Sequence, residues 1–165
     1  MESLVLRGAT FCTSKATLAA GSTSTLSSTG TLHFCIEGKA YSHAALSNTA
    51  TPTTDVTTAA AFVAVGASKG CAFVVGYNAE GTLLCAQGAI VDLTTEAGGA
   101  DANFQTPPQF PSLPTDFCPI GYIITKVGAS GSAWTFGTSN LTGPPSNVLH
   151  TYVDVMVLPT RPQVS

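Results

Sequence analysis

From Thr31 onward, the chain consists of short apolar or alternating runs that are broken by turn residues at spacings of roughly ten positions. This spacing is typical of antiparallel sandwiches and barrels. The runs predict strands over residues 31–36, 39–41, 61–65, 71–77, 82–91, 120–127, 133–136 and 148–158. We therefore expect an all-β fold, an antiparallel β-sandwich or barrel built of hairpins.

Two short turns fix the expected register of the first hairpins. Glu37-Gly38 suits a two-residue turn between the first two strands, because glycine tolerates positive φ. A four-residue loop over 78–81 closes a later hairpin. That loop length predicts three opposed pairs: Tyr77 with Thr82, Cys71 with Gly88, and Cys85 with Val74.

The last strands are predicted in the same way. Pairing 120–127 with 133–136 puts Lys126 across from Trp134, where a cation–π contact can form. Residues 148–158 alternate, which predicts a half-buried strand. Its apolar face carries Leu149, Val153, Val155 and Val157, and its other face carries His150, Tyr152 and Asp154.

The remaining segments predict no regular core element. Residues 42–60 are interpreted as a surface loop and 94–119, with its prolines, as extended chain without a strand. Residues 1–30 are rich in Ser, Thr and Ala, with too few apolar positions for a helical stripe. We expect an extended N-terminal arm over 1–30 and a single β domain over 31–165. The alternative is that 1–30 pack on the β core as an edge strand.

The arm is predicted to contact a partner through its apolar residues Leu4, Val5, Leu6 and Phe11.

The amino-acid composition argues against two classes of partner, nucleic acids and membranes. Only 9% of the 165 residues are charged, whereas Thr, Ser, Ala and Gly together make up 77 of them. The net charge of −3 provides no basic patch, so we expect no nucleic-acid partner. No apolar run approaches the ~20 residues that cross a bilayer, so we expect no membrane partner. A surface so poor in charge suits a subunit that packs against others.

The sequence presents no signature of a metal, cofactor or disulfide framework. The cysteines are odd in number, are never closer than fourteen positions and include no CxxC pair: Cys12, Cys35, Cys71, Cys85 and Cys118. Reduced, buried thiols are the expectation. The acidic start, Met1 to Arg7, does not resemble a secretory signal, so we expect synthesis in a cytoplasm without export.

Catalysis is the weakest interpretation. His33 and His150 fall in predicted strands and His43 in a loop, and no nucleophile elbow or cysteine-protease motif accompanies them. A pair of carboxylates brought together by folding, as in glycosidases, is not excluded by any pattern. We expect a protein that is not an enzyme.

Three segments resemble a group of small virion proteins of tailed bacteriophages. The first is an F-x-I-x-G-K-x-Y hairpin at 34–41, the second a G-x-N-A-x-G-T turn at 76–82, and the third an aromatic-x-D-V-M strand at 152–156. The likeness extends over most of residues 30–160.

This resemblance implies a decoration or cement protein on the surface of a phage head. Such a subunit binds the major capsid protein, stabilises the head and forms a homo-oligomer, most often a trimer. The alternative is a tail or baseplate protein that recognises a receptor or carbohydrate, for which an exposed aromatic platform is the expected mark.

Overall fold

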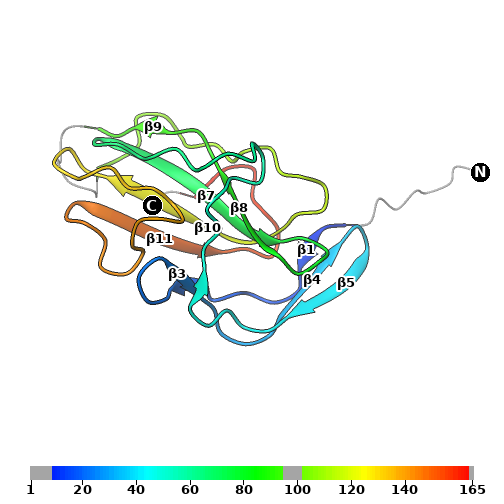
Figure 1. Cartoon of the computed structure of the whole chain (residues 1–165). Helices are drawn as coiled ribbons and strands as arrows, with labels where there is room; N and C mark the ends of the chain where they lie inside the picture. Colours follow the sequence, from blue (N-terminus) through cyan, green and yellow to red (C-terminus); the bar gives the residue numbers. More distant parts are fainter. Residues whose placement is uncertain (1–8, 95–101, 164–165) are drawn as a thin grey trace, which may run out of the picture.

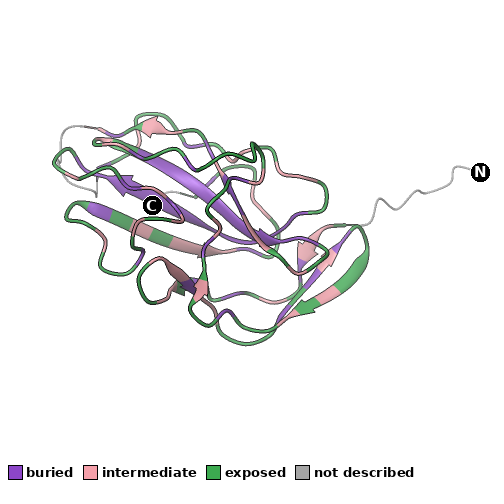
Figure 2. Ribbon diagram, viewed as in Figure 1, coloured by how far each residue is buried: buried purple, intermediate pink, exposed green. Residues whose placement is uncertain are grey.

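Two long antiparallel strands form the centre of the fold: β7 (Lys69–Tyr77) and β10 (Cys118–Val127). All ten residues of β10 are buried, and so is β7 from Gly70 onward, as Figure 2 shows. The computed structural model describes residues 9–94 and 102–163 (Figure 1). A strand pair buried on both sides requires a cover on each face.

The main sheet extends outward from this pair. Its strand order is β11-β10-β7-β8, with β11 (Val148–Asp154) at one edge and β8 (Leu83–Gln87) at the other. Short β9 (Val91–Asp92) pairs with β7 beyond the end of β8. The predicted strand over 82–91 is therefore interrupted at Gly88, where a Cβ would meet the carbonyl oxygen of Gln109.

Two small antiparallel sheets complete the fold. One has the order β1-β4-β5 and the other β2-β3-β6. Their strands are β1 (Phe11–Cys12), β2 (Ala19–Ala20), β3 (Thr25–Ser27), β4 (Leu32–Ile36), β5 (Lys39–His43) and β6 (Thr49–Ala50). The expected all-β antiparallel fold is confirmed, and no sheet closes into a barrel in the described part of the chain. Within the same residues, no helix of the length and apolarity needed to cross a membrane occurs.

The small sheets cover the first face of the main sheet. Side chains at alternate positions of β7, such as Phe73 and Val75, enter a core that also contains Phe34 of β4 and Leu26 of β3. An aromatic group lies at its centre, with the Phe73 and Phe136 rings stacked at 5.0 Å. Sheet-on-sheet burial of this kind provides most of the stabilisation.

The second face is covered by chain that forms no strand. Val74, Tyr122 and Ile124 pack there against the proline-rich segment that precedes β10. Phe110 meets the ring of Tyr122 edge-on at 5.0 Å. The extended conformation expected for the proline-rich segment is consistent with this role, because prolines lack the donors that a ladder needs.

Residues 9–30 differ from the expected arm. They form β1, β2 and β3, and Cys12, Ala16, Leu18 and Leu26 are buried in the same core as β7 and β10. Residue 30 therefore marks no boundary between an arm and a domain in the described residues. These four side chains are separated along the chain and fill gaps between the sheets. Filling such gaps does not require a regular apolar stripe.

The predicted register of the β7–β8 hairpin is wrong by one residue. Tyr77 pairs with Leu83, and Cys85 with Val75. The side chain of Asn78 explains the shift, because its Oδ1 accepts a hydrogen bond from the backbone N–H of Thr82 at 2.8 Å. That bond holds Thr82 in the turn, so the loop is one residue longer than expected.

The predicted hairpin between 120–127 and 133–136 is also wrong. Lys126 lies opposite Leu149 of β11, and its Nζ is 5.2 Å from the centre of the Phe104 ring. Trp134 instead forms an isolated bridge with Val65 and is fully buried. Burial of the indole among aromatic side chains outweighs the short local pairing.

The faces predicted for residues 148–158, which include β11, are wrong in part. Leu149 and Val157 are exposed, whereas His150 and Tyr152 turn toward the first core. His150 faces inward because Trp134 lies 4.5 Å from its ring and Thr125 Oγ1 lies 3.0 Å from its Nδ1. These contacts come from residues distant along the chain, which alternation cannot reveal.

Gly76 provides a test of the central strand pair. Its Cβ would collide with the carbonyl oxygen of Cys118 on β10, so Gly76→Ala should lower the free energy of unfolding by at least ~2 kcal/mol. Gly66→Ala is the control, because that position opens on empty space. Urea unfolding of both variants measures the difference, and equal midpoints would contradict the packing described here.

Candidate interaction surface

The first described residues of the N-terminal segment are held between the β4–β5 turn and the C-terminal segment. Gly38 N–H donates to the carbonyl of Ala9 at 3.3 Å, and Cys12 N–H donates to that of Met156 at 2.7 Å. Of the predicted interface residues, Phe11 is half-buried on β1, opposite Cys35. Leu4, Val5 and Leu6 lie outside the described residues.

Exposed apolar side chains lie beside this junction. Met156 is 44% and Val157 is 68% exposed, whereas Val155 just before them is buried in the second core. Strand β11 ends at Asp154, so the following residues no longer alternate between a core face and a solvent face. Neighbouring apolar side chains exposed together are a mark of an interaction surface.

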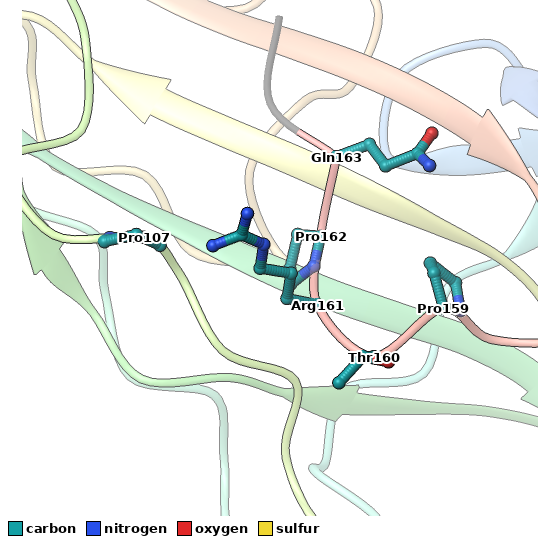
Figure 3. Close-up of a pocket in the computed structure, with 6 residues that line it drawn as sticks. All are labelled: Pro107, Pro159, Thr160, Arg161, Pro162 and Gln163. Carbon is teal, nitrogen blue, oxygen red and sulfur yellow. The ribbon is translucent and has the colours of Figure 1, made fainter.

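Two depressions lie along the C-terminal segment, and the first includes these side chains. The first, of about 360 Å³, is lined by Lys15, Tyr122, Val153, Asp154, Val155, Met156, Val157, Pro159 and Gln163. The second, of about 490 Å³, is lined by Pro107 and residues 159–163 (Figure 3). Pro159 and Gln163 belong to both, so the depressions form one grooved surface along the C-terminal segment. We call it the C-terminal groove.

The C-terminal groove is lined mainly by apolar and proline side chains, and its three charged residues are Lys15, Asp154 and Arg161. Arg161 is exposed, and Figure 3 shows its guanidinium group extending on the side of Pro107. Asp154 is engaged within the fold, since its Oδ1 accepts a hydrogen bond from Leu18 N–H at 2.8 Å. Tyr122 Oη accepts one from Gln163 N–H at 3.0 Å and thereby holds the segment against the sheet.

A third depression, of about 460 Å³, lies beside Asp55, whose side chain is only 5% exposed. Its Oδ1 accepts hydrogen bonds from the N–H and hydroxyl of Thr57, both at 2.7 Å. The amide of Gln87 bonds to both backbone groups of Val63. These bonds attach the loop before β7 to β8, so the buried carboxylate has a structural role.

The histidines considered as catalytic bases occupy structural positions. His43 stacks on Tyr77 with ring centres 4.4 Å apart, and its Nδ1 lies 2.8 Å from the carbonyl of Ala44. His33 is exposed on β4. His150 faces the core, as described above. The imidazoles of His43 and His150 are therefore engaged in contacts within the fold, and that of His33 is exposed on a strand.

The five cysteines are free, and all but Cys35 are buried. Within residues 9–94 and 102–163, no cluster of three or more His, Cys, Asp or Glu side chains is arranged to hold a metal ion. The sulfurs of Cys12 and Cys118 lie 3.7 Å apart.

The comparisons with known proteins give no relative. No protein-family model, no curated protein and no solved structure matches this chain.

The buried imidazole of His150 predicts a pH-dependent stability. Burial lowers the pKa of His150 to about 4, from its ordinary value of 6.5. The unfolded chain therefore binds more protons between these values, and stability is lost as the pH falls from 6.5 toward 4. The loss amounts to on the order of 3 kcal/mol.

Replacing the imidazole tests this prediction. In His150→Asn the free energy of unfolding should change less between pH 7 and pH 4, as urea titrations at each pH measure. His33→Asn, on an exposed strand position, is the matched control and should keep the slope of the original protein. Equal slopes in all three proteins would refute the assignment.

Proposed function

We propose that this protein is a non-enzymatic virion structural protein, a decoration or cement subunit that binds the major capsid protein on a phage head and stabilises it. The observation that carries the proposal is the mainly apolar surface at the junction of the N-terminal and C-terminal segments. That surface contains Met156, Val157 and the C-terminal groove.

The placement of the resembling motifs supports this proposal. Phe34 and Tyr41 of the hairpin motif stack at 5.7 Å, and Phe34 stacks at 5.7 Å on Tyr77 of the turn motif. Glu37 and Gly38 both have positive φ, as a tight two-residue turn requires. The motifs at 34–41 and 76–82 thus form one aromatic stack, which fits motifs that maintain a rigid scaffold.

The rigidity of the core fits the same role. A cement subunit holds neighbouring capsomers by repeated contacts at symmetric positions, and it needs a firm body with contact segments at its rim. Here β1 contacts β10, and Cys12 of β1 donates its N–H to the carbonyl of Met156, which follows β11. The described parts of the N-terminal and C-terminal segments therefore lie side by side, where one partner can contact both.

The competing function, a tail or baseplate protein that recognises a carbohydrate, has less support. Sugar recognition commonly uses an exposed aromatic platform, and Trp134 is the one tryptophan of the chain. It is 0% exposed, and its Nε1–H donates to the carbonyl of Asn140 at 2.9 Å. The indole thus belongs to the core.

Copy number tests the proposed role. We expect hundreds of copies on the head in purified particles, grouped in threes, because the resemblance implies trimers at local threefold positions. Quantitative gel analysis and cryo-electron microscopy of virions measure this. Single-digit copy numbers, or a location on the tail, would contradict the proposal.

The contact with the capsid is tested by removing residues 1–8. The shortened protein should keep its melting temperature, because the described core begins with Cys12, but its binding to heads assembled without it should weaken at least tenfold. Removing 1–30 should instead destabilise the fold, since Leu18 and Leu26 are lost from the core.

A matched pair of substitutions examines the C-terminal half of the surface in the same binding assay. Val157→Ser should weaken head binding, whereas Val63→Ser, at a position 63% exposed on another loop, should not. Equal binding by both variants would contradict a contact between the C-terminal groove and the capsid.

A further inference from the structure

Two thiols meet where the N-terminal strand packs on the centre of the fold. Cys12 of β1 and Cys118 of β10 are 106 positions apart in the chain, and their sulfurs lie 3.7 Å apart. Cys12 is 1% and Cys118 is 0% exposed. The Cys12 thiol also donates to the carbonyl of Pro119 at 3.2 Å.

We propose that Cys12 and Cys118 form an oxidative modification site, in which a peroxide closes a disulfide that attaches the N-terminal segment covalently to β10. The proposal goes beyond the capsid role and does not depend on it. A disulfide requires an S–S distance of about 2.05 Å, so the sulfurs must approach by ~1.7 Å.

The local structure permits this approach. Strand β1 is only two residues long and pairs with β4 through Phe11 and Cys12, with one further backbone hydrogen bond from Thr13 N–H to the carbonyl of His33. Rotation about the Cα–Cβ bond of Cys12, with a small shift of this short strand, can bring its sulfur to Cys118. Strand β10 is fixed between β7 and β11 and remains in place.

The two thiols take different roles in the reaction. The hydrogen-bond contact between the two thiols lowers the pKa of Cys12 despite burial and, together with burial, raises the pKa of Cys118. Cys12 is therefore the thiolate that reacts first. Cys118 is the resolving thiol.

The chemistry balances with hydrogen peroxide as the oxidant. The Cys12 thiolate attacks one peroxide oxygen, the O–O bond breaks, and a sulfenic acid and hydroxide form. The sulfur of Cys118 then attacks the sulfur of Cys12, and the S–S bond forms. The sulfenic oxygen leaves as water with the Cys118 proton, so two thiols and one peroxide yield one disulfide and two waters.

The other thiols are less suited to this reaction. Burial raises the pKa of Cys71 to about 12, and its sulfur donates to the carbonyl of Gly88 at 3.1 Å. Burial also raises the pKa of Cys85. Cys35 is near Cys118 and half-buried, so it is the one competing partner that an experiment must separate.

The test treats the full-length reduced protein with one equivalent of hydrogen peroxide and then blocks the remaining thiols with N-ethylmaleimide. Free thiols should fall from five to three per chain, and dithiothreitol should restore them. Combined tryptic and chymotryptic digestion without reduction should yield residues 12–15 linked to residues 118–122. Cleavage after Phe117 and Tyr122 separates Cys118 from Cys71 and Cys85.

Variants complete the test. Cys12→Ser and Cys118→Ser should each abolish the loss of two thiols, whereas Cys35→Ser and Cys71→Ser should not. The oxidised protein should also melt at a higher temperature than the reduced one, because the disulfide restricts the unfolded chain. The melting temperature of each reduced variant shows whether it is folded.

Three outcomes would overturn the proposal: a link between Cys35 and Cys118, disulfides between chains, or five free thiols after peroxide treatment. An unchanged melting temperature on formation of the Cys12–Cys118 link would also overturn the claim that it fastens β1 to the core.

Discussion

The pairing of β7 with β10 is the constraint on which the rest of the structure depends. Both strands are buried on both faces, so neither face of the main sheet can be left to water. Two small sheets cover one side, and segments without strands cover the other. With only 9% charged residues and many small ones, the chain has few long polar side chains to shield such a sheet. Its covers are therefore other parts of the backbone: the small sheets of the N-terminal segment on one face, and the proline-rich segment before β10 with the C-terminal segment on the other.

This requirement explains why residues 9–30 belong to the fold. Leu18 and Leu26 close gaps between the small sheets and the main sheet, so the segment is structural although its composition is that of a linker. It also explains the C-terminal segment, where Val155 is buried while Met156 and Val157 are exposed. When one side chain of an extended segment packs on the sheet, the side chains next to it are exposed. Those exposed side chains are available to a partner.

Sequence patterns predicted the elements whose structure is local. The runs around Phe73 and Ile123 are long and apolar, and the Glu37-Gly38 turn determines its own hairpin, so these strands could be located. Patterns failed where a specific side-chain contact decides the register or the pairing of a strand. Asn78 shifts the β7–β8 register by a hydrogen bond within its own turn, and Trp134 is buried in the core instead of pairing with β10. The inward face of β11 likewise depends on Trp134, which is sixteen positions from His150.

The candidate surface was predictable only in part, because its contacts join residues that are distant along the chain. Apolar residues near the N-terminus indicated a contact segment. The contacts of Cys12 with Met156 and with Cys118 could not be predicted, because they form only when β1 lies beside the C-terminal segment and β10. The same two-residue strand thus borders the surface proposed for the capsid and carries a thiol of the proposed oxidation site. Fastening β1 to β10 would add a covalent bond between this short strand and the central strand pair. In the reduced protein, backbone hydrogen bonds hold the same segment: Cys12 N–H donates to the carbonyl of Met156, and Gly38 N–H donates to that of Ala9. A partner that contacts the segment would then meet a strand whose position is set by the central pair and no longer by these exchangeable bonds.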